Sequence, residues 1–264
     1  MSYEKIKVAE EAGVAVITLA DPAAMNAIGI DMAQELHQAL REASAPGSSA
    51  RAVVLTGEGR GFCSGANLAQ VAGGGGGGGG IDAGSSVETI YNPLVTAVRD
   101  LAIPIVTAVN GAAAGVGCSL ALLGDIIIAA ESAYFLQAFR RIGLIPDGGS
   151  TYLLPRMIGR ARAMEMALLG ERLPAARALE WGLINRCTPD AELMPTALAI
   201  AQDLAKGPAS LGLSRQTIWA GLDSSWAEQI DREAKGQTVA GRTEDFREGV
   251  AAFLQKRPAK FKGR

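Results

Sequence analysis

The chain has 264 residues, of which 48% are hydrophobic, and its 25 Lys and Arg nearly balance its 27 Asp and Glu. A near-neutral chain with only 5% aromatic residues lacks the basic face and the stacking surface that nucleic-acid binding usually requires. The longest apolar runs, at 103–109 and 126–130, are far shorter than the roughly 20 residues that span a bilayer. Composition therefore excludes nucleic-acid and membrane-spanning classes and indicates a globular protein with an ample core.

The cysteine and histidine content argues against a metal site. Cys63, Cys118 and Cys187 have no metal-ligand spacing, and His37 is the single histidine. The amino terminus shows no charged-then-apolar targeting pattern. We expect no bound metal and a reducing, cytoplasmic setting.

The first half of the chain alternates strand patterns with helix patterns. Residues 6–18 alternate apolar and polar positions around Ala12-Gly13, which predicts a hairpin. Residues 30–43 have helical periodicity, and residues 52–56 form an apolar run typical of a buried strand. Residues 103–109 and 126–130 repeat the strand pattern, with a helical pattern over 87–101. Strands separated by helices favour parallel pairing through right-handed crossovers, so the predicted fold class is α/β.

The second half is almost wholly helical in pattern. The predicted helices cover 163–169, 174–181, 191–206, 214–220, 226–239 and 245–255. We expect a core over residues 1–205 and a helical oligomerisation region over residues 206–264, because a late helical segment with apolar edges often joins subunits.

Three segments are rich in glycine. Residues 73–80 are eight consecutive glycines, which predicts a mobile loop because glycine loses the most conformational entropy on ordering. The run lacks the Lys-Ser/Thr ending of a phosphate loop. The other two segments, 61–68 and 110–120, each follow a strand pattern and precede a helix pattern, where unpaired N–H groups are available. The alternative is that their glycines only permit tight packing.

Several motifs recur in a characteristic order along nearly the whole chain. They are Asn26-Ala27, Leu55-Thr56-Gly57, residues 62–68, Val109-Asn110-Gly111, residues 115–118, Asp125, residues 145–149, residues 181–184 and Lys256-Arg257-Pro258. In this order they resemble the enoyl-CoA hydratase/isomerase (crotonase) superfamily. The resemblance implies a spiral of ββα turns with a helical carboxy-terminal region that assembles trimers or dimers of trimers. It also implies an acyl-CoA thioester substrate, with coenzyme A as part of the substrate and no separate cofactor.

The resemblance also assigns binding roles to particular positions. The backbone N–H groups of Ala66 and Val116 correspond to an oxyanion hole, which stabilises the enolate that forms when the carbon beside a thioester carbonyl loses a proton. Backbone near Ala24, together with Asn67 and Leu68, corresponds to the coenzyme A site. Lys256, on the same or a neighbouring subunit, corresponds to a phosphate contact, with a solvated basic tail as the alternative.

The sequence departs from the hydratases of this superfamily at two positions. Hydratases carry two glutamates that handle water, and the matching positions here hold Ser119 and Phe139. Hydration requires one group to deprotonate water and another to supply a proton. Ordinary hydratase activity is therefore disfavoured.

Asp147 is the remaining candidate for proton transfer. Taken alone, an Asp before Gly-Gly-Ser-Thr indicates a helix N-cap. In the superfamily, segments resembling residues 143–149 place an aspartate beside the acyl chain in double-bond isomerases, in ring-epoxide isomerases of phenylacetate breakdown and in an aryl-CoA dehalogenase. We expect Phe139, Leu144 and Ile145 to form apolar walls that raise the pKa of Asp147 by desolvation.

One carboxylate suffices for an isomerase, because a single base can take a proton and return it elsewhere on the same molecule. The sequence thus favours an enzyme that moves a double bond from the 3- to the 2-position of an enoyl-CoA, or that rearranges a ring-epoxide thioester. Two alternatives remain: a dehalogenase with Asp147 as nucleophile, and a thioester-binding protein without turnover.

Overall fold

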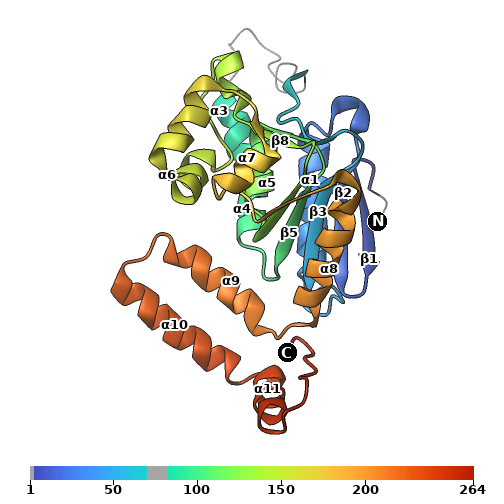
Figure 1. Cartoon of the computed structure of the whole chain (residues 1–264), viewed down its shortest axis with the longest axis vertical. Coiled ribbons are helices and arrows are strands. Elements are labelled where there is room, and N and C mark those ends of the chain that lie inside the picture. Colours follow the sequence, from blue (N-terminus) through green and yellow to red (C-terminus); the bar gives the residue numbers. More distant parts are fainter. Residues whose placement is uncertain (1–2, 70–82) are drawn as a thin grey trace.

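The computed structural model describes residues 3–69 and 83–264. The predicted loop at 73–80 lies outside these residues. The described chain forms a mixed α/β core, with a set of carboxy-terminal helices that extends to one side (Figure 1). This arrangement confirms the predicted fold class.

The main sheet has six strands in the order β1-β2-β3-β5-β7-β10. Its strands are β1 (Ile6–Glu11), β2 (Val14–Leu19), β3 (Ala52–Gly57), β5 (Ile105–Val109), β7 (Ile126–Ala130) and β10 (Arg186–Thr188). β1 and β2 pair antiparallel, and every other pair in this sheet is parallel. β3 and β5 are buried along almost their whole length, as parallel strands covered on both faces are expected to be. The predicted hairpin and the three predicted buried strands are confirmed.

A second sheet of four short strands runs in the order β4-β6-β8-β9. Its strands are β4 (Gly61–Cys63), β6 (Ala112–Ala114), β8 (Tyr134–Leu136) and β9 (Leu173–Pro174). β4, β6 and β8 directly follow β3, β5 and β7 along the chain, so the ββ unit repeats three times before a helical segment. Asn110 joins two of these turns, because its Oδ1 accepts from the Gly57 N–H at 3.1 Å and its Nδ2 donates to the Gly59 carbonyl at 3.0 Å. The second sheet therefore aligns the turns that carry the candidate site.

The helical segments of the core cover the sheets. They are η1 (Pro22–Ala24), α1 (Ile30–Ala43), α3 (Ala83–Ser86), η2 (Val87–Tyr91), α4 (Asn92–Arg99), α5 (Val116–Leu122), η3 (Ala138–Ile142), α6 (Ser150–Leu169), α7 (Ala175–Glu180), η4 (Asp190–Glu192) and α8 (Leu193–Lys206). The predicted start of α6 at residue 163 is wrong. The helix begins at Ser150 and is kinked at Gly159, where φ is 77°.

The carboxy-terminal region consists of α9 (Ser210–Gly221), α10 (Trp226–Ala240) and α11 (Glu244–Leu254). These helices extend away from the sheets (Figure 1). Arg215 of α9 ties them to the core: its Nε donates to Asp125 Oδ2 at 2.7 Å, and its other nitrogens donate to the carbonyls of Val98, Arg99 and Leu101. Within the described residues, no helix is both long enough and apolar enough to span a membrane.

Candidate active site

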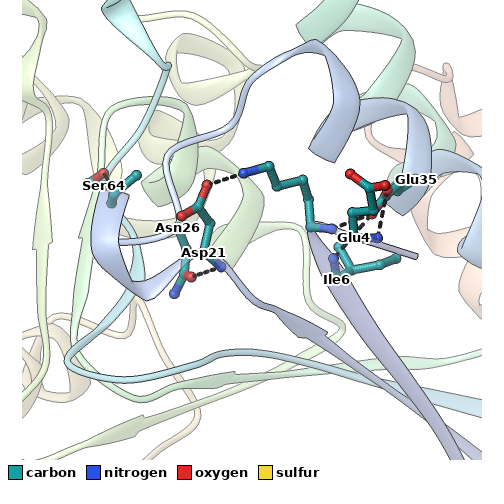
Figure 2. A network of polar contacts seen from close by, with 8 residues as sticks. Glu4, Ile6, Asp21, Asn26, Glu35 and Ser64 are labelled. Atoms are coloured by element: carbon teal, nitrogen blue, oxygen red, sulfur yellow. Dashed lines mark hydrogen bonds and ion pairs between the residues drawn. The ribbon is translucent and has the colours of Figure 1, made fainter. Parts of the chain in front are cut away.

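The first element of the site is the turn that follows β4. The fully buried Asn26 supports it, since Asn26 Nδ2 donates to the carbonyls of Gly61 and Phe62 while Oδ1 accepts from the Asp21 N–H. Figure 2 shows Asn26 beside Asp21, which in turn accepts from the ammonium of Lys5. The Ser64 N–H donates to the Met25 carbonyl at 3.0 Å. The η1 loop is therefore held against the chain segment that leads to Ala66.

The N–H of Ala66 points away from the segment that pairs with it. Ala66 forms a parallel bridge with Ile28, in which the Ile28 N–H donates to the Gly65 carbonyl and the Asn67 N–H donates to the Ile28 carbonyl. In a parallel pairing of this kind, the central residue directs its own N–H to the opposite side. Val116 is the first residue of α5, and the N–H of a first helical residue has no partner within its helix.

Two glycines bring these amides together. A Cβ on Gly115 would lie 3.8 Å from the Gly65 Cα, and a Cβ on Gly65 would lie 2.9 Å from the Ala114 carbonyl oxygen. The backbones that precede Ala66 and Val116 are thus in contact. Gly65 has φ of +108°, a backbone conformation that residues with a side chain rarely adopt. The predicted pair of adjacent backbone amides is consistent with this geometry.

Asp147 lies on the loop that packs against the same end of α5. A Cβ on the following residue, Gly148, would lie 2.9 Å from the Ser119 Cβ and 3.0 Å from the Val116 Cγ2. Asp147 is not a helix cap, because α6 begins at Ser150 with Gly149 as its N-cap and no side-chain capping bond. The N-cap interpretation is therefore wrong. The loop places Asp147 one residue from the contact with Val116.

The carboxyl group of Asp147 is desolvated and incompletely paired. Burial raises its pKa from the ordinary value of 3.8 to about 6, which confirms the predicted direction. Its Oδ1 is buried and has no hydrogen-bond partner within the described part of the chain. Nearby, burial and then the charge of Asp147 raise the pKa of Tyr91 to about 12. A carboxyl group with this pKa and an unused oxygen is suited to accept and return a proton near neutral pH.

Ser119 and Phe139, which the resemblance matches to the two glutamates of hydratases, make other contacts in this structure. Ser119 is fully buried and its Oγ donates to the Asp147 carbonyl at 2.9 Å. Phe139 is buried in η3, and its Cζ would lie 3.8 Å from a Cβ on Gly115. Phe139 therefore contacts the turn before Val116, as an apolar wall of the site would.

The prediction that Leu144 and Ile145 form apolar walls is not supported within this chain. Leu144 is 43% exposed and Ile145 is 80% exposed. They lie in an irregular segment between Gly143 and Gly148, and their apolar character does not determine which way they face. Asp147 is nevertheless desolvated by burial, and Tyr91 lies close enough for the charge of Asp147 to raise its pKa.

The predicted coenzyme A residues fall in two places. Ala24 is exposed in η1. Leu68 is 50% exposed and lies two residues after Ala66, in the segment that packs against η1. Asn67, which stands between Ala66 and Leu68 in the sequence, is half-buried. Lys256 follows α11 at the other end of the molecule from β8 (Figure 1). A single chain therefore groups Ala24, Asn67 and Leu68 but does not add Lys256 to them.

Sequence reasoning missed three residues near Asp147. Tyr91 lay within an unremarkable helical pattern. Ser150 was read only as part of a helix start, and Gln137 carried no signal in its immediate sequence. These residues differ from ordinary core residues only through contacts made in the folded chain, such as the hydrogen bond between Gln137 Nε2 and Ser150 Oγ.

Comparisons with known proteins agree with the fold and assign the chain to a family. The family described as enoyl-CoA hydratase/isomerase matches residues 9–264. A probable enoyl-CoA hydratase of Rhodobacter capsulatus is 46% identical, covering all of both chains. The 1,2-epoxyphenylacetyl-CoA isomerase of Escherichia coli is also 46% identical, over 96% of this chain and 97% of its own. The crystal structure of a putative enoyl-CoA hydratase from Streptomyces coelicolor superposes with a TM-score of 0.92 at 34% identity, covering 100% of this chain and 96% of that one.

The chain belongs to the enoyl-CoA hydratase/isomerase family. The resemblance noted from the sequence motifs is thus confirmed over almost the whole chain.

Proposed function

We propose that this protein is an acyl-CoA isomerase that uses Asp147 as its single proton-transfer group. The observation that carries the proposal is the Asp147 carboxyl itself: its pKa is raised to about 6 by burial, and its Oδ1 is buried without a partner in the described chain. The amides of Ala66 and Val116 supply the complementary electrostatics. They donate to the thioester oxygen as it gains enolate charge.

For a 3-enoyl thioester, the reaction needs one base only. The Asp147 carboxylate takes a proton from C2, and the electron pair spreads over the dienolate to the thioester oxygen. The carboxylic acid so formed exchanges its proton with solvent and delivers a proton to C4, and the double bond then lies between C2 and C3. No atom is gained or lost, and no second acid is needed.

Hydration needs a second proton-transfer group, which positions 119 and 139 do not offer among the described residues. Water would have to be deprotonated by one group while another donates to carbon. Ser119 already donates to the Asp147 carbonyl, and Phe139 has no exchangeable proton. These two residues favour isomerisation over hydration.

A ring-epoxide thioester is the substrate class we favour. The Escherichia coli relative of 46% identity is named as a 1,2-epoxyphenylacetyl-CoA isomerase. Such a thioester also carries acidic hydrogens on the carbon beside its carbonyl, so the same base and amides can start its rearrangement. The 3-enoyl thioesters are the second class to test, because they require the same proton removal.

Substrate binding is proposed to follow the family arrangement. Ala24, Asn67 and Leu68 would hold the coenzyme A portion of the substrate, and Lys256 would reach its phosphates from a neighbouring subunit. The helices after residue 206 would form the trimer or dimer of trimers. Their exposed apolar side chains fit this role, including Ile218, Trp226, Phe253 and Leu254 at 68–83% exposure.

The test compares the wild type, Asp147→Asn and a control, Asp203→Asn, on 2-enoyl, 3-enoyl and ring-epoxide thioesters. Asp203 is exposed on α8. We expect the wild type and the control to form products of unchanged mass in light water and to incorporate deuterium from heavy water, and Asp147→Asn to lose turnover. Undiminished turnover by Asp147→Asn, or stoichiometric addition of water by the wild type, would overturn the proposal.

A further inference from the structure

Three fully buried polar side chains meet behind the Asp147 loop. Ser119 comes from α5, Ser150 from the first turn of α6, and Gln137 from the residue between β8 and η3. Each has 0% exposure. Buried polar groups are costly unless they are hydrogen-bonded. Both serine hydroxyls and the Gln137 Nε2 are paired within the cluster, while Gln137 Oε1 has no partner among the described residues.

Their hydrogen bonds run in one direction. Gln137 Nε2 donates to Ser150 Oγ at 3.1 Å, and Ser150 Oγ lies 2.6 Å from Ser119 Oγ. Ser119 Oγ donates to the Asp147 carbonyl at 2.9 Å. Since a hydroxyl has one proton, Ser119 can donate to Asp147 only if Ser150 donates to Ser119. The sequence of donors therefore starts at Gln137 and ends on the Asp147 backbone.

The chain of bonds holds the backbone of Asp147 and does not use Oδ1 of its carboxyl. The Asp147 carbonyl accepts from Ser119 Oγ and also from the Ser150 N–H at 3.1 Å. Gly148 has φ of +60°, and a Cβ added to it would lie 2.9 Å from the Ser119 Cβ. Meanwhile Oδ1 of Asp147 has no partner among the described residues. The two hydrogen bonds to its carbonyl therefore fix the backbone of Asp147, while Oδ1 of its carboxyl is left to accept a proton.

We propose that Gln137, Ser150 and Ser119 form a positioning chain that sets the Asp147 carboxyl relative to the amides of Ala66 and Val116. This inference rests on the proposed function and deepens it. Ser119 thus acts through Asp147, in the place where hydratases carry a glutamate that handles water. The Ser119 side chain lies directly against Gly148, where an added Cβ would come within 2.9 Å of the Ser119 Cβ, so a larger side chain at position 119 would press on the Asp147 loop.

The experiment uses Ser119→Ala and Ser150→Ala, with Ser224→Ala as the matched control. Ser224 also donates to a backbone carbonyl, that of Ala220 at 2.8 Å, but lies after α9. A displacement of about 1 Å at a reacting group can lower a rate about 100-fold. We expect both site variants to lower kcat by about 10- to 100-fold, with KM nearly unchanged because the substrate-binding amides stay in place.

The pH profile separates positioning from general loss of structure. When the loop relaxes, water reaches the carboxyl, and the midpoint of the kcat profile moves from about 6 toward the ordinary value of 3.8. The control keeps both kcat and midpoint. If one site variant fails to fold, the other still removes a link of the same chain and gives the same readouts.

The outcomes distinguish this inference from the proposed function. If Asp147→Asn abolishes turnover while Ser119→Ala and Ser150→Ala keep kcat and the pH midpoint at wild-type values, the positioning chain is wrong and the isomerase proposal stands. If Asp147→Asn keeps full turnover, the proposed function fails first, whatever the serine variants do.

Discussion

Asp147→Asn is expected to make the protein less active and more stable, and the gain in stability is expected to depend on pH. The carboxyl has a pKa of about 6 in the folded chain against an ordinary 3.8. At about 1.4 kcal/mol per unit this difference corresponds to about 3 kcal/mol. Because the carboxyl is only partly buried, solvent screening reduces the effect, and we expect about 1 to 2 kcal/mol.

The sign follows from proton binding. Below pH 3.8 the acid is protonated in both folded and unfolded chains, so it contributes nothing to the pH dependence. Between 3.8 and about 6 the unfolded chain releases its proton first, and the free energy of unfolding falls as the pH rises. Above about 6 the full penalty of the buried charge is present. An asparagine removes that penalty, so the variant gains stability at pH 8 and nothing near pH 3.

Urea unfolding of the wild type, Asp147→Asn and the control Asp203→Asn at a series of pH values measures this difference. The control is expected to follow the wild type, since Asp203 is exposed. If Asp147→Asn is less stable than the wild type at pH 8, or if its gain is the same at acid and alkaline pH, the buried-charge argument is refuted. In the same samples kcat of the wild type should rise with pH through a midpoint near 6.

Three further predictions concern the supports of the site. Gly65→Ala is expected to lower kcat about 100- to 1000-fold, because a Cβ 2.9 Å from the Ala114 oxygen shifts the Ala66 amide; steady-state kinetics checks this, and a wild-type rate would contradict it. Ser119→Glu is expected to reduce isomerisation, to destabilise the fold by at least about 1 to 3 kcal/mol through overpacking, and to form no hydrated product by mass spectrometry. Arg215→Ala is expected to cost about 3 to 5 kcal/mol in urea unfolding, since it leaves Asp125 without its buried cation; a loss below 1 kcal/mol would argue against the tie.

The strands of the main sheet were predictable because they combine apolar and β-branched residues in short uninterrupted runs. β3 and β5 are buried on both faces, so their sequences carry no competing polar pattern. The strands of the second sheet were not predictable. β6 is Ala-Ala-Ala, and its extended conformation comes from pairing with β4 and β8 rather than from its own preference.

The limits of sequence reasoning at the site have two physical causes. Apolar character at Leu144 and Ile145 indicated burial, but in a loop bounded by left-handed glycines the side-chain direction is set by the backbone. Asp147 matched the composition of a helix N-cap, yet the helix begins three residues later. In contrast, the family resemblance assigned the backbone donors to Ala66 and Val116, and the glycine-rich turns before these two residues agreed with that assignment because such turns can leave N–H groups unpaired.

The donors proposed at Ala66 and Val116 are main-chain groups, and the close approach of Gly65 and Gly115 fixes their positions. No exchange of side chain at 66 or 116 can delete them unless the new residue is proline. Substitutions at the surrounding residues can therefore change the reaction of the thioester's acyl group. The backbone groups proposed to bind the thioester carbonyl stay in place. Positions 119, 139 and 147 lie beside these backbone groups, so a library confined to these three codons tests how far the reaction can change while the backbone donors stay the same.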